Sequence, residues 1–367
     1  MNIPFVDLKL QYISLKAEID NAINNVITET AFIGGKYVEE FERSFAEAYG
    51  VDHCISCANG TDSLYIIMKM LGITSGDEVI TVANSWISTS ETISQTGAKP
   101  VFVDCDPVYY TIDEQQITEK ITSRTKAIIP VHLFGQMCNM EAIMEIAKKH
   151  SLFVIEDCAQ SHFSKQDGIN AGLFGIASSF SFYPGKNLGA YGDAGAIITK
   201  DPELAKSFKM FGRHGALIKH QHVIEGINSR MDGLQAAILA VKLKRLGEWT
   251  KARQSNSAKI SAQLSGVGDL VLPKVRMNTE HSFHLYVIQT DKRDELAVYL
   301  KRKGIETAIH YPVILPLLTA YQYLGHATSD FPVSSKMSNR ILSLPLYPEL
   351  TDETISYLTK AIKDFFG

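Results

Sequence analysis

The 367-residue sequence has few cysteines and no long apolar run. Its five cysteines, an odd number, are spread from Cys54 to Cys158, which is not a disulfide framework and favours a reducing compartment. No apolar stretch approaches the ~20 residues that a membrane-spanning helix needs. The N-terminal residues lack the basic region, apolar core and small-residue cleavage site of a signal peptide. We therefore expect a cytoplasmic protein without a membrane-spanning segment.

Blocks of like charge are also absent. The sequence has 36 Lys and Arg against 40 Asp and Glu, which gives a formal net charge of −4. Such a balance gives no reason to expect nucleic acid or an anionic membrane surface as a partner, so any anionic ligand must be bound by a few local groups. The apolar fraction of 45% and the charged fraction of 21% are ordinary for a globular protein and exclude the fibrous and disordered classes.

Between residues 50 and 200, short apolar runs alternate with helical patterns. Apolar runs of about four to six residues indicate strands buried on both faces, and the helices between them supply the crossovers that parallel strands need. The expected strands are His53–Cys57, Glu78–Val82, Pro100–Val103, Ala127–Val131, Phe153–Ile155, Ser178–Phe182 and Ala196–Thr199. The expected crossover helices are Ser63–Leu71, Ile87–Gln95 and Asn139–His150. This pattern predicts an α/β protein with a mostly parallel, seven-stranded sheet between helices.

The two ends of the sequence have different patterns. The first fifty residues are helical in periodicity, and a long helical pattern runs over Asp232–Trp249. Beyond residue 250 we expect strands at Phe283–Gln289 and Ile305–His310, a helix at Lys292–Lys303, and a last helix capped by Thr351. The sequence thus predicts a large domain over residues 1–250 and a small α+β domain over residues 251–367.

Two short motifs suggest metal or redox chemistry but are incomplete. Cys54 and Cys57 form a C-x-x-C inside a predicted buried strand, and no second pair is present, which favours a packing role. His281 and His284 have the spacing of metal ligands, yet no Cys, Asp or Glu cluster near them completes a ligand set. We therefore expect no metal. The glycine fingerprint of dinucleotide-binding enzymes is missing as well.

Chemically useful residues follow several predicted strands at their carboxyl ends, the edge where open α/β sheets bind ligands. Asn59-Gly60-Thr61 opens a helix and can accept a phosphate, whereas Asp157 follows a buried strand and needs a cationic partner. Ser181 and Lys186 come after the next strand, and a buried lysine can act as an amine nucleophile. Each also has a structural explanation, Asp157 as a helix cap and Lys186 as a solvated loop residue. Their order together fits pyridoxal phosphate, which has a phosphate, a ring nitrogen and an aldehyde.

Longer motifs surround these residues. They are PFVDL near the start, Phe32-Ile33-Gly34-Gly35, Asn59–Leu64, Glu156–Gln160, SFSFYPGKNLGAYGDAGA around Lys186, GINSRMDGLQAA from Gly226, and His310-Tyr311-Pro312. With these motifs the sequence resembles, over nearly its whole length, the DegT/DnrJ/EryC1/StrS sugar aminotransferases. The resemblance implies a pyridoxal-phosphate-dependent transferase of fold type I.

The resemblance also implies roles for individual residues. Lys186 would form the covalent link to the cofactor's aldehyde, and Asp157 would pair with the ring nitrogen. The other implied cofactor contacts are Gln160 at the phenolic oxygen, Trp86 on the ring face, and Gly60, Thr61 and Ser181 at the phosphate. Asn228 would reach the phosphate from a partner subunit, which implies a homodimer with shared active sites.

The likeness extends to the substrate. Lys186 argues against the dehydratase branch of the family, which carries His at that position. The turn Phe182–Ala190 is similar to members that aminate C3 of a dTDP-linked 3-keto-6-deoxyhexose, with L-glutamate as donor, to give Quip3N- or Fuc3N-type products. The implied substrate contacts are Tyr183, His310 and Tyr311 at the hexose and Lys219 of the other subunit at the diphosphate. One departure is Pro316, where many members place a His.

Two alternatives remain open from the sequence alone. One is a C4 nucleotide-sugar aminotransferase of the same family, and the other is a regulator that binds pyridoxal phosphate without catalysis. The sequence determines neither the nucleotide nor the gluco or galacto configuration of the sugar.

Overall fold

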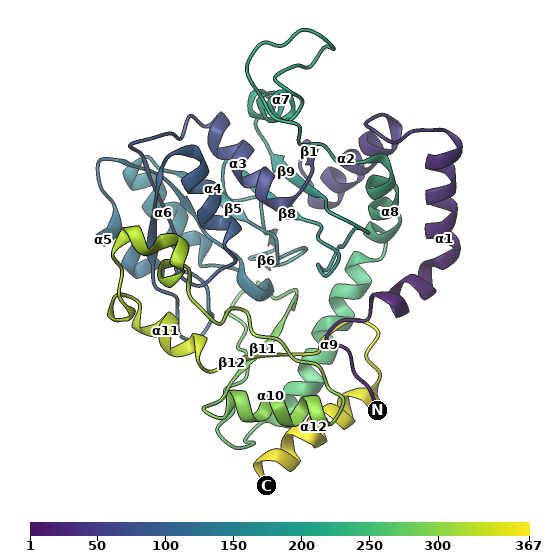
Figure 1. Cartoon of the computed structure of the whole chain (residues 1–367), viewed down its shortest axis with the longest axis vertical. Coiled ribbons are helices and arrows are strands. Elements are labelled where there is room, and N and C mark those ends of the chain that lie inside the picture. The colour runs from purple at the N-terminus through teal and green to yellow at the C-terminus, as the bar shows by residue number, and fades with distance from the viewer.

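The computed structural model describes all 367 residues and has a seven-stranded central sheet (Figure 1). Its strands are β1 (His53–Cys57), β2 (Glu78–Val82), β3 (Lys99–Val103), β4 (Thr125–Ile129), β5 (Phe153–Asp157), β8 (Ala177–Ser181) and β9 (Gly195–Thr199). They lie in the order β1-β9-β8-β5-β4-β2-β3, and only β9 runs antiparallel to its neighbours. The predicted α/β fold with a mostly parallel sheet is confirmed, each predicted strand lying within about two residues of its place.

The one antiparallel strand has a simple cause. Parallel neighbours need a crossover of a dozen or more residues, usually a helix. The segment between β8 and β9 contains no helix, because it forms the Pro-Gly turn that carries Lys186. The chain therefore returns beside β8 in the opposite direction, and this segment is free to line the edge of the sheet.

Both faces of the sheet are covered by helices. On one face lie α3 (Gly60–Met70), α4 (Ser88–Thr96) and α7 (Pro202–Phe211), and on the other lie α2 (Lys36–Tyr49), α6 (Met140–His150) and α8 (Gly233–Leu243). Successive residues of a strand serve opposite faces, as Ile197 and Ile198 of β9 do by packing into different apolar clusters. This double burial is why the strands are apolar throughout.

The remaining elements surround this layered core. Preceding α2 is α1 (Leu8–Thr28), which packs against α8. Short elements are α5 (Ile117–Lys120), α11 (Pro332–Ser338), and the small sheet of β6 (Lys165–Gln166), β7 (Ile169–Asn170) and β10 (Thr279–Glu280). No helix in the structure combines the length and the apolar character that crossing a bilayer would take.

The C-terminal part of the chain differs from the prediction in two places. The helical pattern expected over 232–249 is divided into two helices, because α8 ends at Leu243 and α9 (Leu246–Leu264) begins after two turn residues. The strand expected at Ile305–His310 is wrong, since this segment makes only isolated bridges. Instead β11 (Tyr286–Gln289) pairs antiparallel with β12 (Ile341–Leu344), which the sequence analysis missed.

The two predicted C-terminal helices are confirmed. They are α10 (Arg293–Arg302) and α12 (Asp352–Phe366), and the Thr351 hydroxyl caps α12 by accepting from the Thr354 N–H at 3.2 Å. These helices and the β11–β12 pair enclose a second apolar core. Residue 250 lies inside α9, which contributes Leu246 to the sheet core and Ile260 to the second core. The domain boundary at residue 250 therefore stays a prediction.

Candidate active site

A cavity of about 630 Å³ opens beyond the carboxyl ends of β1, β2, β5 and β8. Ten of the residues predicted from sequence line it: Gly60, Thr61, Trp86, Asp157, Gln160, Ser181, Tyr183, Lys186, His310 and Tyr311. They come from five separate stretches of the chain, the last of them after α10, and the fold brings them together. Lys219 and Asn228 do not line this cavity.

Lys186 lies on a turn whose shape is fixed by backbone hydrogen bonds. Its N–H donates to the Tyr183 carbonyl at 2.8 Å, and the Ala190 N–H donates to the Phe182 carbonyl at 2.8 Å. Gly189 permits this turn, because a Cβ there would lie 2.2 Å from the Pro184 carbonyl oxygen. The ammonium group of Lys186 makes no hydrogen bond within the protein, and burial lowers the pKa of Lys186 to about 8.

This lowered pKa predicts how the reaction of Lys186 with an aldehyde depends on pH. Only the neutral amine attacks a carbonyl, so covalent labelling of the cofactor-free protein by pyridoxal phosphate should accelerate with rising pH, with a midpoint at about 8 instead of the ordinary 10.5. The labelling rate is measured by borohydride trapping and mass spectrometry across the neutral and alkaline range. A midpoint close to that of free lysine would contradict the burial effect.

Asp157 ends β5 and is almost fully buried, with 5% of its surface exposed. Its Oδ2 accepts from the Thr89 hydroxyl at 2.8 Å and its Oδ1 accepts from the Ala159 N–H at 3.1 Å, so both partners are neutral. Burial raises the pKa of Asp157 above its usual value. A buried carboxylate of this kind is stabilised by a cation in the adjoining cavity, and a protonated ring nitrogen would be such a cation.

The start of α3 is shaped to hold an anion. The Asn59 side chain caps the helix by accepting from the Asp62 N–H at 2.8 Å, and the first-turn N–H groups and the helix dipole favour negative charge. The hydroxyls of Thr61 and Ser88 lie 2.7 Å apart at this end of the cavity. A Cβ on Gly60 would lie 2.7 Å from the Ser181 Cβ, so only glycine allows the helix to approach Ser181 this closely.

Replacing Gly60 with alanine should therefore weaken cofactor binding. The added methyl group must push α3 and Ser181 apart, which misplaces the phosphate donors, and we expect the Kd for pyridoxal phosphate to rise by about tenfold or more. The Kd is measured by absorbance titration of the cofactor-free protein. Gly247→Ala in α9 is the matched control, since a Cβ there meets nothing within 4 Å. Equal affinities for the two variants would contradict the steric argument.

Gln160, Trp86 and Tyr311 line the cavity and lie next to one another. The Gln160 Oε1 accepts from the Phe134 N–H at 2.7 Å, and its Nε2 donates to the Tyr311 hydroxyl at 3.1 Å. The amide is thus fixed with its second N–H hydrogen free for a ligand oxygen. The rings of Trp86 and Tyr311 are 5.7 Å apart, and Trp86 is 57% exposed at the mouth.

The structure adds residues that the sequence analysis missed. Thr89 orients Asp157, Ser88 joins the anion end, and Phe5 stacks on the His310 ring at a centroid distance of 5.7 Å. Both Ser88 and Thr89 lie in a helix that was expected, but nothing in the sequence distinguishes their hydroxyls from ordinary helix-surface residues. Pro316 is buried in a short helical turn and does not line the cavity.

The two residues expected from a partner subunit lie elsewhere on the surface. Lys219 lines a second pocket of about 410 Å³ together with other basic side chains, Arg213, His214, His220, His222 and Arg230. Asn228 is exposed beside it and accepts from Arg230 at 3.0 Å. Within one chain, therefore, these residues serve a different surface from that of Lys186.

The cavity fits pyridoxal phosphate in each of its chemical parts. It offers an anion site at α3, a buried carboxylate without an ion-pair partner, and an amine with a lowered pKa. The sequence model of the DegT/DnrJ/EryC1/StrS aminotransferase family matches residues 13–363. The chain belongs to this family.

Similar proteins agree with this placement. The chain is 45% identical over 100% of its length to a pleiotropic regulatory protein of Geobacillus stearothermophilus, of which it covers 99%. It is 41% identical to a dTDP-3-amino-3,6-dideoxy-alpha-D-galactopyranose transaminase of Aneurinibacillus thermoaerophilus, with 99% of each chain covered. Two other relatives, 40% and 38% identical, are named as aminotransferases of UDP-linked sugars oxidised at C3.

Solved structures extend the agreement to the fold. The structure of DesV from S. venezuelae superposes with a TM-score of 0.97 at 37% identity, covering 99% of this chain and 98% of that one. A solved relative that is 31% identical holds the cofactor as pyridoxamine phosphate. The predicted family, the fold type I architecture and pyridoxal phosphate as cofactor are thereby confirmed, and the protein is an aminotransferase.

Proposed function

We propose that this aminotransferase moves the amino group of L-glutamate to C3 of a dTDP-linked 3-keto-6-deoxyhexose, giving a dTDP-3-amino-3,6-dideoxyhexose. The observation that carries the reaction type is the pairing, in one cavity, of Lys186 at a pKa of about 8 with the buried Asp157 carboxylate. The C3 and dTDP assignments are supported by the Phe182–Ala190 turn and by a relative named for a dTDP-3-amino sugar.

The residues of the cavity have different roles in the proposed reaction. When bound, pyridoxal phosphate supplies an electron sink for the carbon that gains or loses a proton. Lys186 carries that proton through its amine, which is neutral in a substantial fraction near pH 8. Asp157 holds the ring nitrogen protonated, and Gly60, Thr61 and Ser181 fix the phosphate end, so the ring cannot drift from Lys186.

The mouth of the cavity suits a sugar. Tyr183 is 59% exposed there, and His310, whose Nδ1 lies 2.8 Å from the Ser343 hydroxyl, keeps its other ring nitrogen available. Burial lowers the pKa of His310 to about 4, so the ring is neutral and can donate to or accept from sugar hydroxyls. Tyr183, His310 and Tyr311 are the proposed hexose contacts.

A substrate panel tests the assignment. Purified protein is supplied with L-glutamate and, in turn, with 3-keto and 4-keto sugars linked to dTDP and to UDP. We expect repeated release of 2-oxoglutarate with the dTDP-linked 3-keto sugar, and NMR should place the new amine on C3. An amine at C4 would favour the C4 alternative, preference for the UDP sugar would overturn the nucleotide, and absence of multiple turnovers with any sugar would favour a regulator.

A homodimer with shared sites is part of the proposal. Lys219 and Asn228 are exposed and lie outside the cavity, and the apolar residues Ile33, Leu217 and Ile218 near them are between 41% and 62% exposed. A partner surface would cover these apolar groups and bring Lys219 to the diphosphate of its neighbour's substrate. The proposed location of this dimer is the cytoplasm.

Subunit mixing tests the shared site. Lys186→Ala removes the nucleophile from one chain and Lys219→Ala removes the diphosphate contact from the other. If Lys219 contributes to its partner's cavity, a mixed dimer has both substitutions in one active site, and its other active site is unchanged. The mixture should therefore be more active than either variant alone. Activity equal to the average of the separate variants would contradict a shared site.

A further inference from the structure

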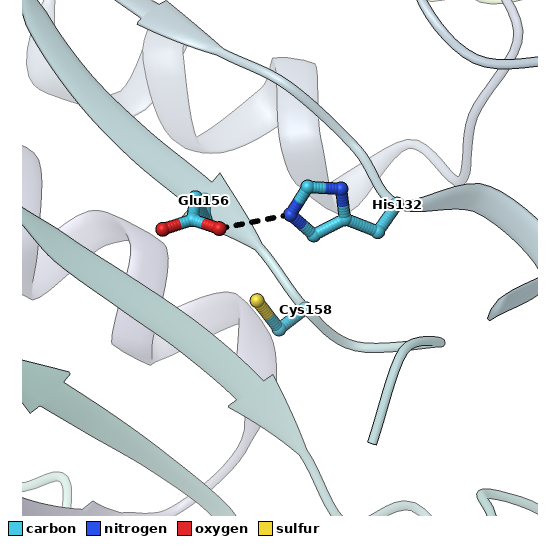
Figure 2. Close-up of side chains that lie close together, drawn as sticks. All are labelled: His132, Glu156 and Cys158. Carbon is cyan, nitrogen blue, oxygen red and sulfur yellow. Dashed lines mark hydrogen bonds and ion pairs between the residues drawn. The ribbon is translucent and has the colours of Figure 1, made fainter. Parts of the chain in front are cut away.

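A buried hydrogen-bond network adjoins Asp157 on the other face of β5. Successive residues of a strand point to opposite faces, so the Glu156 side chain points away from the cavity into which Asp157 points. Both Glu156 and His132 are fully buried, and the His132 Nε2 lies 3.0 Å from the Glu156 Oε2 (Figure 2). The proposed function uses neither residue.

Every acceptor position of Glu156 is taken by a donor. Oε1 accepts from the N–H groups of Phe174 and Gly175, both at 2.8 Å, and Oε2 accepts from the Gly172 N–H at 2.8 Å and from His132. An oxygen pair that receives four hydrogens has none of its own, so Glu156 is a carboxylate.

The same hydrogen bonds define His132. Its Nδ1 accepts from the Cys138 N–H at 3.1 Å, and its Nε2 donates to Glu156. Cys158 lies close by, within 4.8 Å of both groups, and burial raises the pKa of its thiol to about 12. Both ring nitrogens of His132 and all four acceptor positions of Glu156 are used by hydrogen bonds within the protein, so neither side chain has a free lone pair to offer a metal ion.

The network is joined to Asp157 through the backbone. The His132 N–H donates to the Asp157 carbonyl at 3.1 Å, and the Asp157 N–H donates to the Pro130 carbonyl at 2.9 Å. Gly175, whose N–H reaches Glu156, packs so closely that a Cβ there would lie 2.3 Å from the Val154 carbonyl oxygen. Glu156, which precedes Asp157, and His132, which hydrogen-bonds the Asp157 backbone, are therefore held in place by the same group of hydrogen bonds.

We propose that Glu156 and His132 are positioning residues that fix the direction of the Asp157 carboxylate toward the ring nitrogen of the cofactor. This inference rests on the role that the proposed function gives to Asp157. The negative charge of Glu156 anchors the segment 172–175 and His132, and His132 in turn holds the Asp157 backbone. A shift of Asp157 by a fraction of an ångström weakens its pairing with the ring nitrogen, and the ring nitrogen then loses its proton at lower pH.

Glu156→Gln tests the proposal. Glutamine replaces one carboxylate oxygen with an NH₂ group, and backbone N–H donors face both oxygen positions. Whichever position the NH₂ group takes, it faces another donor, so the network cannot remain complete. With the full-length protein, we expect the Kd for pyridoxal phosphate to rise by about tenfold. We also expect the pH at which the ring nitrogen of the bound cofactor loses its proton, followed by NMR of cofactor labelled with ¹⁵N at that atom, to fall. His132→Leu, which removes the donor to Glu156, should change both readouts in the same direction, and His132→Gln, which keeps a donor, should restore part of them.

Asp104→Asn is the matched control. Asp104 is also buried, with 2% of its surface exposed, and it accepts backbone N–H groups from Cys105, Val333 and Ser334, yet it does not line the cavity. It should lower the melting temperature as Glu156→Gln does, but leave the midpoint of the ring-nitrogen titration unchanged. If Glu156→Gln kept the midpoint and affinity of the unmodified protein, or if Asp104→Asn moved both equally, the positioning role would be overturned.

These outcomes are separate from those of the proposed function. Unmodified protein that binds pyridoxal phosphate but releases no 2-oxoglutarate would refute catalysis, whereas the variant titrations would still decide whether Glu156 and His132 position Asp157. Should Glu156→Gln fail to fold, His132→Leu and His132→Gln give the same comparison.

Discussion

Lys186→Ala should abolish turnover and leave the fold unchanged. Without the amine no group in the cavity can bond the aldehyde or carry the proton between carbon atoms, so we expect kcat to fall by about 10⁴-fold or more. The fold should persist because the turn is held by backbone bonds, such as that from the Lys186 N–H to the Tyr183 carbonyl, which alanine keeps. Release of 2-oxoglutarate measures the first effect and the melting temperature the second.

Lys242 provides the control for this prediction. Burial lowers the pKa of Lys242 to about 8 as well, but its ammonium group donates to the Gly189 carbonyl at 2.6 Å and does not line the cavity. Lys242→Met should lower the melting temperature and still take up pyridoxal phosphate that borohydride can reduce onto the protein. If Lys186→Ala kept full transamination, or if the label were lost only in Lys242→Met, Lys186 would not be the nucleophile.

The central sheet was predictable because burial on both faces makes each strand a short run of apolar residues, which is visible in the sequence. Two features of the C-terminal part have no such local pattern. The break between α8 and α9 falls at Lys244 and Arg245, two good helix formers, so local propensity gives no sign of it. The partner of β11 is β12, some fifty residues later, and the pairing depends on tertiary packing.

The cavity was predictable for a related reason. The carboxyl ends of parallel strands meet at one edge of a sheet, so the positions of Gly60, Asp157 and Ser181 after predicted strands are enough to place them at the same edge. Thr89 could not be placed in this way, because its contact with Asp157 joins residues 68 apart in sequence through the angle of one helix. The bond between His132 and Glu156 likewise depends on how the segment after β4 approaches β5, which cannot be read from the sequence of either segment alone.

Asp157→Asn should have opposite effects on activity and on the stability of the cofactor-free protein. Asparagine can keep both hydrogen bonds, with its Oδ1 accepting from the Ala159 N–H and its amide donating to the Thr89 hydroxyl, so only the charge is removed. Without that charge the ring nitrogen loses its proton readily, and we expect kcat to fall by about 10²–10³-fold. Turnover with L-glutamate and a keto sugar measures this loss.

The stability effect follows from the sign of the pKa shift. Burial raises the pKa of Asp157 in the folded protein above its unfolded value, so its contribution to stability is full below the unfolded pKa and is lost as pH rises through the folded pKa. At neutral pH the charged, buried carboxylate therefore costs stability that asparagine does not. The cofactor-free Asp157→Asn variant should melt at a higher temperature than the unmodified protein at neutral pH, and the difference should shrink on acidification.

Bound pyridoxal phosphate should reverse the order of the two melting temperatures, because its ring cation stabilises only the charged residue. A variant that is less stable at neutral pH without the cofactor would show that Asp157 is held by a cation within the protein, and the buried carboxylate would then not be reserved for a ligand.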